Sequence, residues 1–190
     1  MDRAYLSLDL DYFNLRIDQI KPLFNYLKLL GVPVKIVDEH HYLAKDAQKY
    51  EYNTLINLDE HSDLYPVKER MGYINCGNWV NFMPGFAKEY IWVRPTPSEM
   101  SRCDNLECPF SGIPNGFDKI STNYKSFRST VRKYQIVAVG VALSLSDGYT
   151  NREVFDSIFE EPSILGWLDE KRNGIVDYMR DHELLINWLD

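Results

Sequence analysis

The stretch INLDEHSDLY (residues 56–65) decides the fold that this sequence predicts, because an apolar run ends there in three potential metal ligands. The residues YNTLINLD (52–59) have the apolar character of a buried strand. Asp59, His61 and Asp63 then stand at every second position, and in an extended chain such residues face one side. Burying these groups is costly unless they are paired or bind a metal. The stretch therefore predicts a core strand that ends in a metal site.

Strand-like and helix-like segments alternate along the rest of the chain. We expect strands at 4–10, 32–37, 52–59, 90–95 and 135–143, and helices at 13–31, 41–50, 123–134 and, two or three of them, between 151 and 188. Pro22 is expected to start or kink a helical turn, and the stretch from Thr96 to about Lys119 to form a long loop. This alternation predicts an α/β fold, a three-layer sandwich around a mainly parallel sheet, in one domain of residues 1–190.

Acidic and histidine residues follow several of the expected strands. These residues are Asp9 and Asp11; Asp38, Glu39, His40 and His41; Asp59, His61 and Asp63; and Asp147 and Glu153. Ligands of parallel sheets bind outside the carboxyl ends of the strands, so we expect these groups to gather at one edge. One or two divalent cations would relieve their repulsion. Carboxylates with imidazoles suit Mn²⁺, Fe²⁺ or Zn²⁺, and the oxygen-rich mixture favours Mn²⁺ over a thiolate-preferring ion. Taken singly, a DxD or HH pair is also common on surfaces without any metal.

The composition limits the classes of partner. A formal charge of −7 argues against nucleic acid and suits a cationic substrate, although solubility alone also accounts for it. The sequence has no secretion signal and no apolar run of the roughly 20 residues that a membrane helix needs. Three cysteines fit a reducing, cytoplasmic location. We expect Cys103 and Cys108 to be reduced thiols, the alternative being a structural or redox-sensitive pair.

Two motifs resemble those of the ureohydrolase superfamily, which includes arginases and agmatinases. LDEHSD (58–63) is similar to its D-x-H-x-D strand end, and SLDLD (7–11) to its S-x-D-x-D strand end. DEHH (38–41) resembles the segment with its single strand-end histidine, and CGNWVNF (76–82) and GYTNRE (148–153) are weaker echoes of its substrate segments. The chain is most similar to a ureohydrolase-like family with HxD-, ENW- and DLDFF-type segments. That family includes peptide arginases, which convert arginine to ornithine within ribosomally made peptides.

The resemblance implies a binuclear centre with two Mn²⁺ per chain. The ligands that it implies are Asp9, Asp11, His40, Asp59, His61 and Asp63. Asp9 and Asp59 would bridge the ions, with His40 and Asp63 completing one site and His61 and Asp11 the other. His40 is preferred to His41 because the family places an acidic residue directly before its ligand.

The resemblance also implies the reaction and its substrate, an arginine-containing peptide. A hydroxide that bridges the ions would attack the guanidinium carbon, and Asp63 would pass a proton to the departing amine, giving ornithine and urea. Glu153 would hold the guanidinium, although a glutamate also suits the first turn of a helix. Asn78 would contact the backbone of the arginine, or else cap a helix that begins at Trp79.

The sequence departs from the family pattern in three places. The SLDLD strand comes first in the chain, which implies reordered strand connectivity. Val80 stands where arginases have a proton-shuttle histidine. At 190 residues the chain is also shorter than an arginase, and we expect the resulting open cleft to suit a peptide.

Three other functions remain open at this stage. The site also suits a small-molecule guanidine hydrolase of the agmatinase type or a single-zinc amide hydrolase of the deacetylase type. The valine at position 80 favours a third alternative, a protein that binds metal without turnover.

Overall fold

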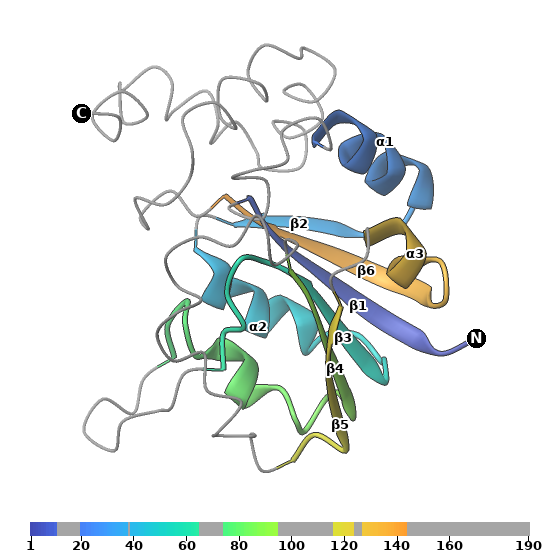
Figure 1. Cartoon of the computed structure of the whole chain (residues 1–190). Coiled ribbons are helices and arrows are strands. Elements are labelled where there is room, and N and C mark those ends of the chain that lie inside the picture. Colours follow the sequence, from blue (N-terminus) through green and yellow to red (C-terminus); the bar gives the residue numbers. More distant parts are fainter. Residues whose placement is uncertain (11–19, 38, 65–73, 95–115, 124–126, 144–190) are drawn as a thin grey trace, which may run out of the picture.

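A six-stranded parallel sheet forms the centre of the molecule (Figure 1). The computed structural model describes residues 1–10, 20–37, 39–64, 74–94, 116–123 and 127–143. The strands are β1 (Arg3–Asp9), β2 (Val34–Val37), β3 (Thr54–Leu58), β4 (Glu89–Val93), β5 (Lys119–Asn123) and β6 (Gln135–Ala142). Their order is β2-β6-β1-β3-β4-β5, and every neighbouring pair is parallel. The prediction of an α/β fold with a parallel sheet is confirmed.

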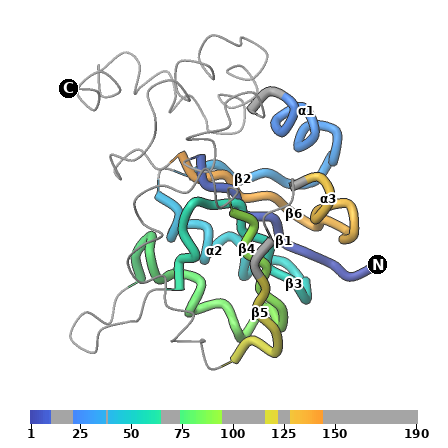
Figure 2. The backbone as a smooth tube through the Cα atoms, in the orientation of Figure 1, coloured from blue at the N-terminus to red at the C-terminus, as the bar shows by residue number. Residues whose placement is uncertain are grey.

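Helical elements cover both faces of this sheet. They are α1 (Ile20–Leu30), α2 (Leu43–Ala47), α3 (Phe127–Val131) and two 3₁₀ turns, η3 (His40–Tyr42) and η4 (Trp79–Phe82). Side chains of α1 and α3 share one apolar cluster with the strands, whereas those of α2 and η4 share a second cluster on the opposite face. The tube view shows the same division, with α1 and α3 on one side and α2 on the other (Figure 2). Among the described residues, every helix is too short or too polar to cross a bilayer.

Alternation along β1 separates an apolar face from a face that carries polar groups. Leu6 and Leu8 belong to the cluster under α1, so Ser7 and Asp9 point to the opposite face, which α2 covers. The parallel register pairs Ser7 with Asn57 and Leu8 with Leu58, which is the last residue of β3. Asp9 and Asp59 each directly follow this last pair, so the register brings the two carboxylates to the same edge of the sheet.

The connections that follow β1 and β3 predict a ligand site at the carboxyl ends of these two strands. The first described helix after β1 is α1, which packs on one face of the sheet. The first described helical element after β3 is η4, which packs on the other face. Two adjacent strands whose connections diverge in this way form a topological switch point, where α/β proteins bind their ligands.

Several sequence-based boundaries needed correction. The segment 119–123 was expected to end a loop and begin a helix, but it forms the edge strand β5, because its backbone pairs with β4. The helix expected at 41–50 is the short helix α2, with η3 preceding it. Where the helix expected at 123–134 is described, it is α3, which ends at Val131, and Asn123 belongs to β5. The helix expected at 13–31 is α1 where it is described, and Pro22 lies in its first turn. The expected C-terminal helices, Cys103 and Cys108 lie outside the described residues.

We predict that Gly140→Ala destabilises the protein. Gly140 lies on β6, and a Cβ there would be 2.5 Å from the Tyr5 hydroxyl and 2.7 Å from both methyl groups of Leu43. Both side chains are fully buried, and the hydroxyl donates a 3.0 Å hydrogen bond to Asp46. Overpacking of this kind costs about 1–3 kcal/mol, measurable by urea unfolding. Gly85→Ala is the matched control, since nothing lies within 4 Å of its Cβ position; equal stability of the two variants would contradict the packing described here.

Candidate metal centre

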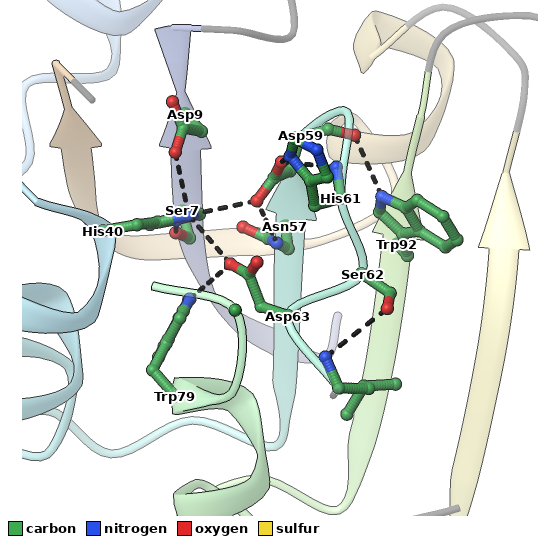
Figure 3. Close-up of polar contacts among 12 residues, drawn as sticks. Ser7, Asp9, His40, Asn57, Asp59, His61, Ser62, Asp63, Trp79 and Trp92 are labelled. Atoms are coloured by element: carbon green, nitrogen blue, oxygen red, sulfur yellow. Dashed lines mark hydrogen bonds and ion pairs between the residues drawn. The ribbon is translucent and has the colours of Figure 1, made fainter. Parts of the chain in front are cut away.

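His40 stands at the centre of a buried cluster of carboxylates (Figure 3). Its Nδ1 lies 3.2 Å from Asp9 Oδ2, 3.0 Å from Asp59 Oδ2 and 2.9 Å from Asp63 Oδ2. Each of these four residues is at most 3% exposed. None of the three oxygens lies in a hydrogen-bonding direction from Nδ1, which therefore has no hydrogen-bond partner among the described residues. A buried nitrogen surrounded by oxygens without hydrogen-bond alignment is the arrangement expected of ligands that share an ion.

Ser7 fixes the orientation of the His40 ring. Its Oγ lies 2.6 Å from Nε2 of His40, on the opposite side of the ring from the carboxylates. Ser7 is fully buried and lies two residues before Asp9 on the same face of β1. Metal-binding histidines use their second ring nitrogen in this way, which sets both the tautomer and the ring plane. The hydroxyl therefore directs Nδ1 toward the carboxylates.

Contacts from β3, from the bend that follows it and from β4 hold Asp59 in place. Its Oδ2 accepts a 3.1 Å hydrogen bond from Nδ2 of Asn57, and its Oδ1 accepts one of 2.6 Å from the backbone N–H of His61. Nε1 of Trp92 donates to the backbone carbonyl of Asp59 at 2.9 Å. The His61 ring is also near, with Nδ1 3.6 Å from Oδ1. One oxygen of Asp59 thus faces His40 and the other faces His61.

Asp63 reaches the cluster through a turn rather than an extended strand. The expectation that residues 59, 61 and 63 alternate in an extended chain is wrong, because β3 ends at Leu58 and a bend follows. Asp63 has a φ of +53°, which is uncommon for a non-glycine residue and folds its side chain back toward His40. Its Oδ2 accepts a 2.6 Å hydrogen bond from Nε1 of Trp79 on η4. This strained position is over-determined by its contacts, as is common at functional sites.

The charges of these groups shift one another's protonation. Burial lowers the pKa of His40, but the Asp63, Asp59 and Asp9 carboxylates outweigh burial and raise it well above its ordinary value. Burial raises the pKa of Asp63, and the negative charge of Asp59 raises it further. Burial also opposes ionisation of Asp59, yet His40 and His61 lower its pKa below the usual range. A protein without a bound cation must therefore retain protons in this cluster to limit repulsion between its carboxylates.

Three of these residues place their ligand atoms close enough together to hold one divalent cation. Ligand atoms of Asp9, His40 and Asp59 all lie within 4.8 Å of one another. Neighbouring ligands of an octahedral ion, each about 2.1 Å from the metal, are about 3 Å apart, and the Nδ1-to-oxygen distances fall near that value. An oxygen-rich set with one imidazole suits Mn²⁺, Fe²⁺ or Zn²⁺.

The structure brings together most of the residues that the sequence singled out. Asp9, His40, Asp59 and Asp63 converge, and His61 lies beside Asp59. His41 follows His40 but is not part of the cluster; burial and the adjacent His40 lower its pKa. Asp11 and Glu153 lie outside the described residues.

The two positions of the expected substrate segment lie in or beside η4. Asn78 directly precedes η4, but its side chain caps no N–H of that turn. Its Oδ1 instead accepts a 2.8 Å hydrogen bond from the backbone N–H of Asn75. Val80 is fully buried in the apolar cluster beneath α2.

Sequence reasoning missed the residues that support the ligands. Ser7 and Asn57 lie two positions before Asp9 and Asp59, so the period of two along each strand was a signal that could have identified them. Trp79 and Trp92 carried no such signal, because they reach Asp63 and Asp59 from separate segments. No protein-family model, curated protein or solved structure shows a significant match to this chain.

We predict that Ser7→Ala weakens Mn²⁺ binding about 10- to 100-fold, because loss of a second-sphere partner frees the His40 ring. Isothermal titration calorimetry with Mn²⁺ measures the change. Thr54→Val is the matched control: it removes another buried hydroxyl, bonded to Glu89 at the amino end of the adjacent strand. Unchanged Mn²⁺ affinity in Ser7→Ala, or an equal loss in both variants, would contradict the role given to Ser7.

Proposed function

We propose that this protein is a Mn²⁺-dependent peptide arginase, which hydrolyses the guanidinium of arginine side chains in a ribosomally made peptide to ornithine and urea. One observation carries the proposal: His40 Nδ1 lies within 3.2 Å of three buried carboxylate oxygens and is hydrogen-bonded to none of them. The carboxylates come from the two segments, SLDLD and LDEHSD, that resemble the metal-binding motifs of ureohydrolases.

The two oxygens of Asp59 support a pair of ions rather than one. Oδ2 faces Nδ1 of His40 at 3.0 Å, and Oδ1 faces Nδ1 of His61 at 3.6 Å. A carboxylate between two imidazoles in this manner is suited to bridge two cations. Asp9 and Asp63 would complete the first site; Asp11, two residues beyond Asp9, is the remaining carboxylate proposed for the second.

Bound Mn²⁺ would supply a nucleophile from water at neutral pH and stabilise the charge that develops during hydrolysis. The protein's own part is to position the substrate and move one proton. Water adds to the guanidinium carbon, the bond from that carbon to the side-chain nitrogen breaks, and urea leaves. We assign the proton transfer from water to the departing amine to Asp63, whose orientation the 2.6 Å bond from Trp79 maintains.

A guanidinium substrate suits the net charge of the chain. The formal charge is −7, and arginine stays protonated at every physiological pH, so long-range attraction favours its approach. In this proposal Glu153 holds the guanidinium by a charge-assisted pair, and Asn78 contacts the peptide backbone.

A single-zinc amide hydrolase is the second candidate. Within the described ranges, Asp9, His40 and Asp59 form the one group of three ligands that meets around a common point. Such a group holds a single ion, and one zinc with an open position is sufficient to hydrolyse an amide. Metal content per chain and the identity of the product distinguish the two candidates.

The reaction is tested with purified protein, Mn²⁺ and an arginine-containing peptide. We expect urea release together with loss of CH2N2 from the peptide for each arginine converted, measured by a urea assay and mass spectrometry. Asp59→Asn keeps the size of the side chain but removes its charge, so metal content and turnover should fall together, turnover by at least about 100-fold.

Asp46→Asn is the matched control for Asp59→Asn, since Asp46 is also a buried carboxylate but bonds to Tyr5 and Lys49 instead. It should retain metal and activity. Glu153→Gln should retain metal and lose turnover of arginine. Full activity of a metal-free Asp59→Asn protein would refute the proposal, whereas one zinc per chain with amide cleavage and no urea would favour the deacetylase type.

A further inference from the structure

A pocket of about 670 Å³ lies beside the metal centre, between β2, η3 and α2. Its apolar part is formed by Ile36, Val37 and Ala44, and Lys35, His41 and Lys45 also line it. This volume is within the range of pockets that bind small ligands or side chains. None of these residues belongs to the carboxylate cluster, so the metal centre leaves the pocket unexplained.

The charge of the pocket is opposite to that of the chain. Lys35 and Lys45 are exposed, and neither forms an ion pair with another described residue. The described residues that line the pocket include no carboxylate. These two ammonium groups, which have no carboxylate partner in the part of the chain that the structure describes, lie beside an apolar floor in a chain of formal charge −7. They form a local site for a carboxylate attached to an apolar group.

Tyr42 adds the kind of aromatic side chain that anchors a partner. It lines the pocket, is 56% exposed, and lies against His41 with ring centroids 4.3 Å apart. Exposed tyrosines of this kind are frequent at binding surfaces, because they provide a large rigid contact area and a polar tip.

The same short turn connects the pocket to the metal centre. His40 and His41 are consecutive residues of η3; the first faces the carboxylates, and the second lines the pocket. Consecutive Cα atoms are about 3.8 Å apart, and an extended peptide spans about 3.3 Å per residue. One extended peptide can therefore place an arginine at the metals and a residue a few positions away in the pocket.

An edge strand forms one wall of the pocket. β2 is the last strand on its side of the described sheet, and Lys35, Ile36 and Val37 all belong to it. Its outer backbone groups have no strand partner among the described residues, so an extended peptide can pair with them. Main-chain pairing would supply affinity, and the lysines would supply a preference for certain side chains.

We propose that this pocket binds the part of the substrate peptide next to the target arginine, and that it selects a segment with an acidic side chain beside an apolar one. The inference rests on the proposed function, since it assigns the recognition of the same substrate. Lys35 and Lys45 pair with the acidic side chain, while Ile36, Val37 and Ala44 contact the apolar one. The pocket determines which arginines are modified, and the metal centre performs the reaction.

The test uses two fluorescent peptides that each contain one arginine and, a few residues away, a leucine. The residue beside the leucine is Glu in one peptide and Lys in the other, and the two peptides are otherwise identical. The double variant Lys35→Glu/Lys45→Glu should bind the Glu peptide about five- to tenfold more weakly, as measured by fluorescence anisotropy, with a matching rise in KM and an unchanged kcat. Lys133→Glu is the matched control, because Lys133 is an exposed lysine beyond α3, the helix on the opposite face. Hydrolysis of agmatine, which is too small to reach the pocket, should be the same in all variants.

The outcomes separate this inference from the proposed activity. If binding of the Glu peptide depends on Lys35 and Lys45 but no urea is released, the role of the pocket in peptide binding is supported and the arginase reaction is refuted. If urea is released but the double variant and Lys133→Glu bind the Glu peptide with the same affinity, the reaction is retained and the proposed role of the pocket is overturned. An equal or stronger affinity of the wild-type protein for the Lys peptide would also overturn it.

Discussion

The convergence of three buried carboxylates on Nδ1 of His40 is the constraint on which the rest of the structure depends. Like charges at this distance in a buried site cannot all remain ionised without compensation. A protonated His40 provides part of that compensation, and a divalent cation in its place would provide more. The surrounding contacts all hold the imidazole and these oxygens together. Ser7 orients the imidazole. Asn57 and the backbone of His61 hold Asp59, and Trp79 holds Asp63.

The parallel sheet determines where this cluster lies. Asp9 ends β1 and Asp59 directly follows the adjacent strand β3, and the first described helical elements after these two strands pack on opposite faces. His40 enters from the end of β2, which is separated from β1 by β6, so the short turn η3 must bring the imidazole over the sheet. That turn leaves His41 facing the neighbouring pocket. The carboxylate cluster and the pocket therefore share one structural element, η3.

Much of the sheet could be predicted from sequence, because apolar runs of strand length are strong signals. The runs 4–10 and 135–143 differ from β1 and β6 by only a residue at their ends. β5 could not be predicted: its sequence KISTN has one apolar residue, and only pairing with β4 makes it a strand. Asp9, Asp59 and His40 were identified as candidate ligands from their places at or after the ends of expected strands. Asp63 was identified for a wrong reason. Its own left-handed backbone conformation and a hydrogen bond from Trp79, 16 positions away, bring its carboxylate to the site.

Mn²⁺-loaded crystals, with anomalous data collected at the manganese edge, test the central claim most directly. The account predicts a strong peak bonded to His40 Nδ1, Asp9 and Asp59, and a second peak between Asp59 Oδ1 and His61 Nδ1. A single peak at the first position would retain the metal centre and favour the one-ion chemistry. A map with no peak at His40, with its ring still enclosed by the three carboxylates, would contradict the account.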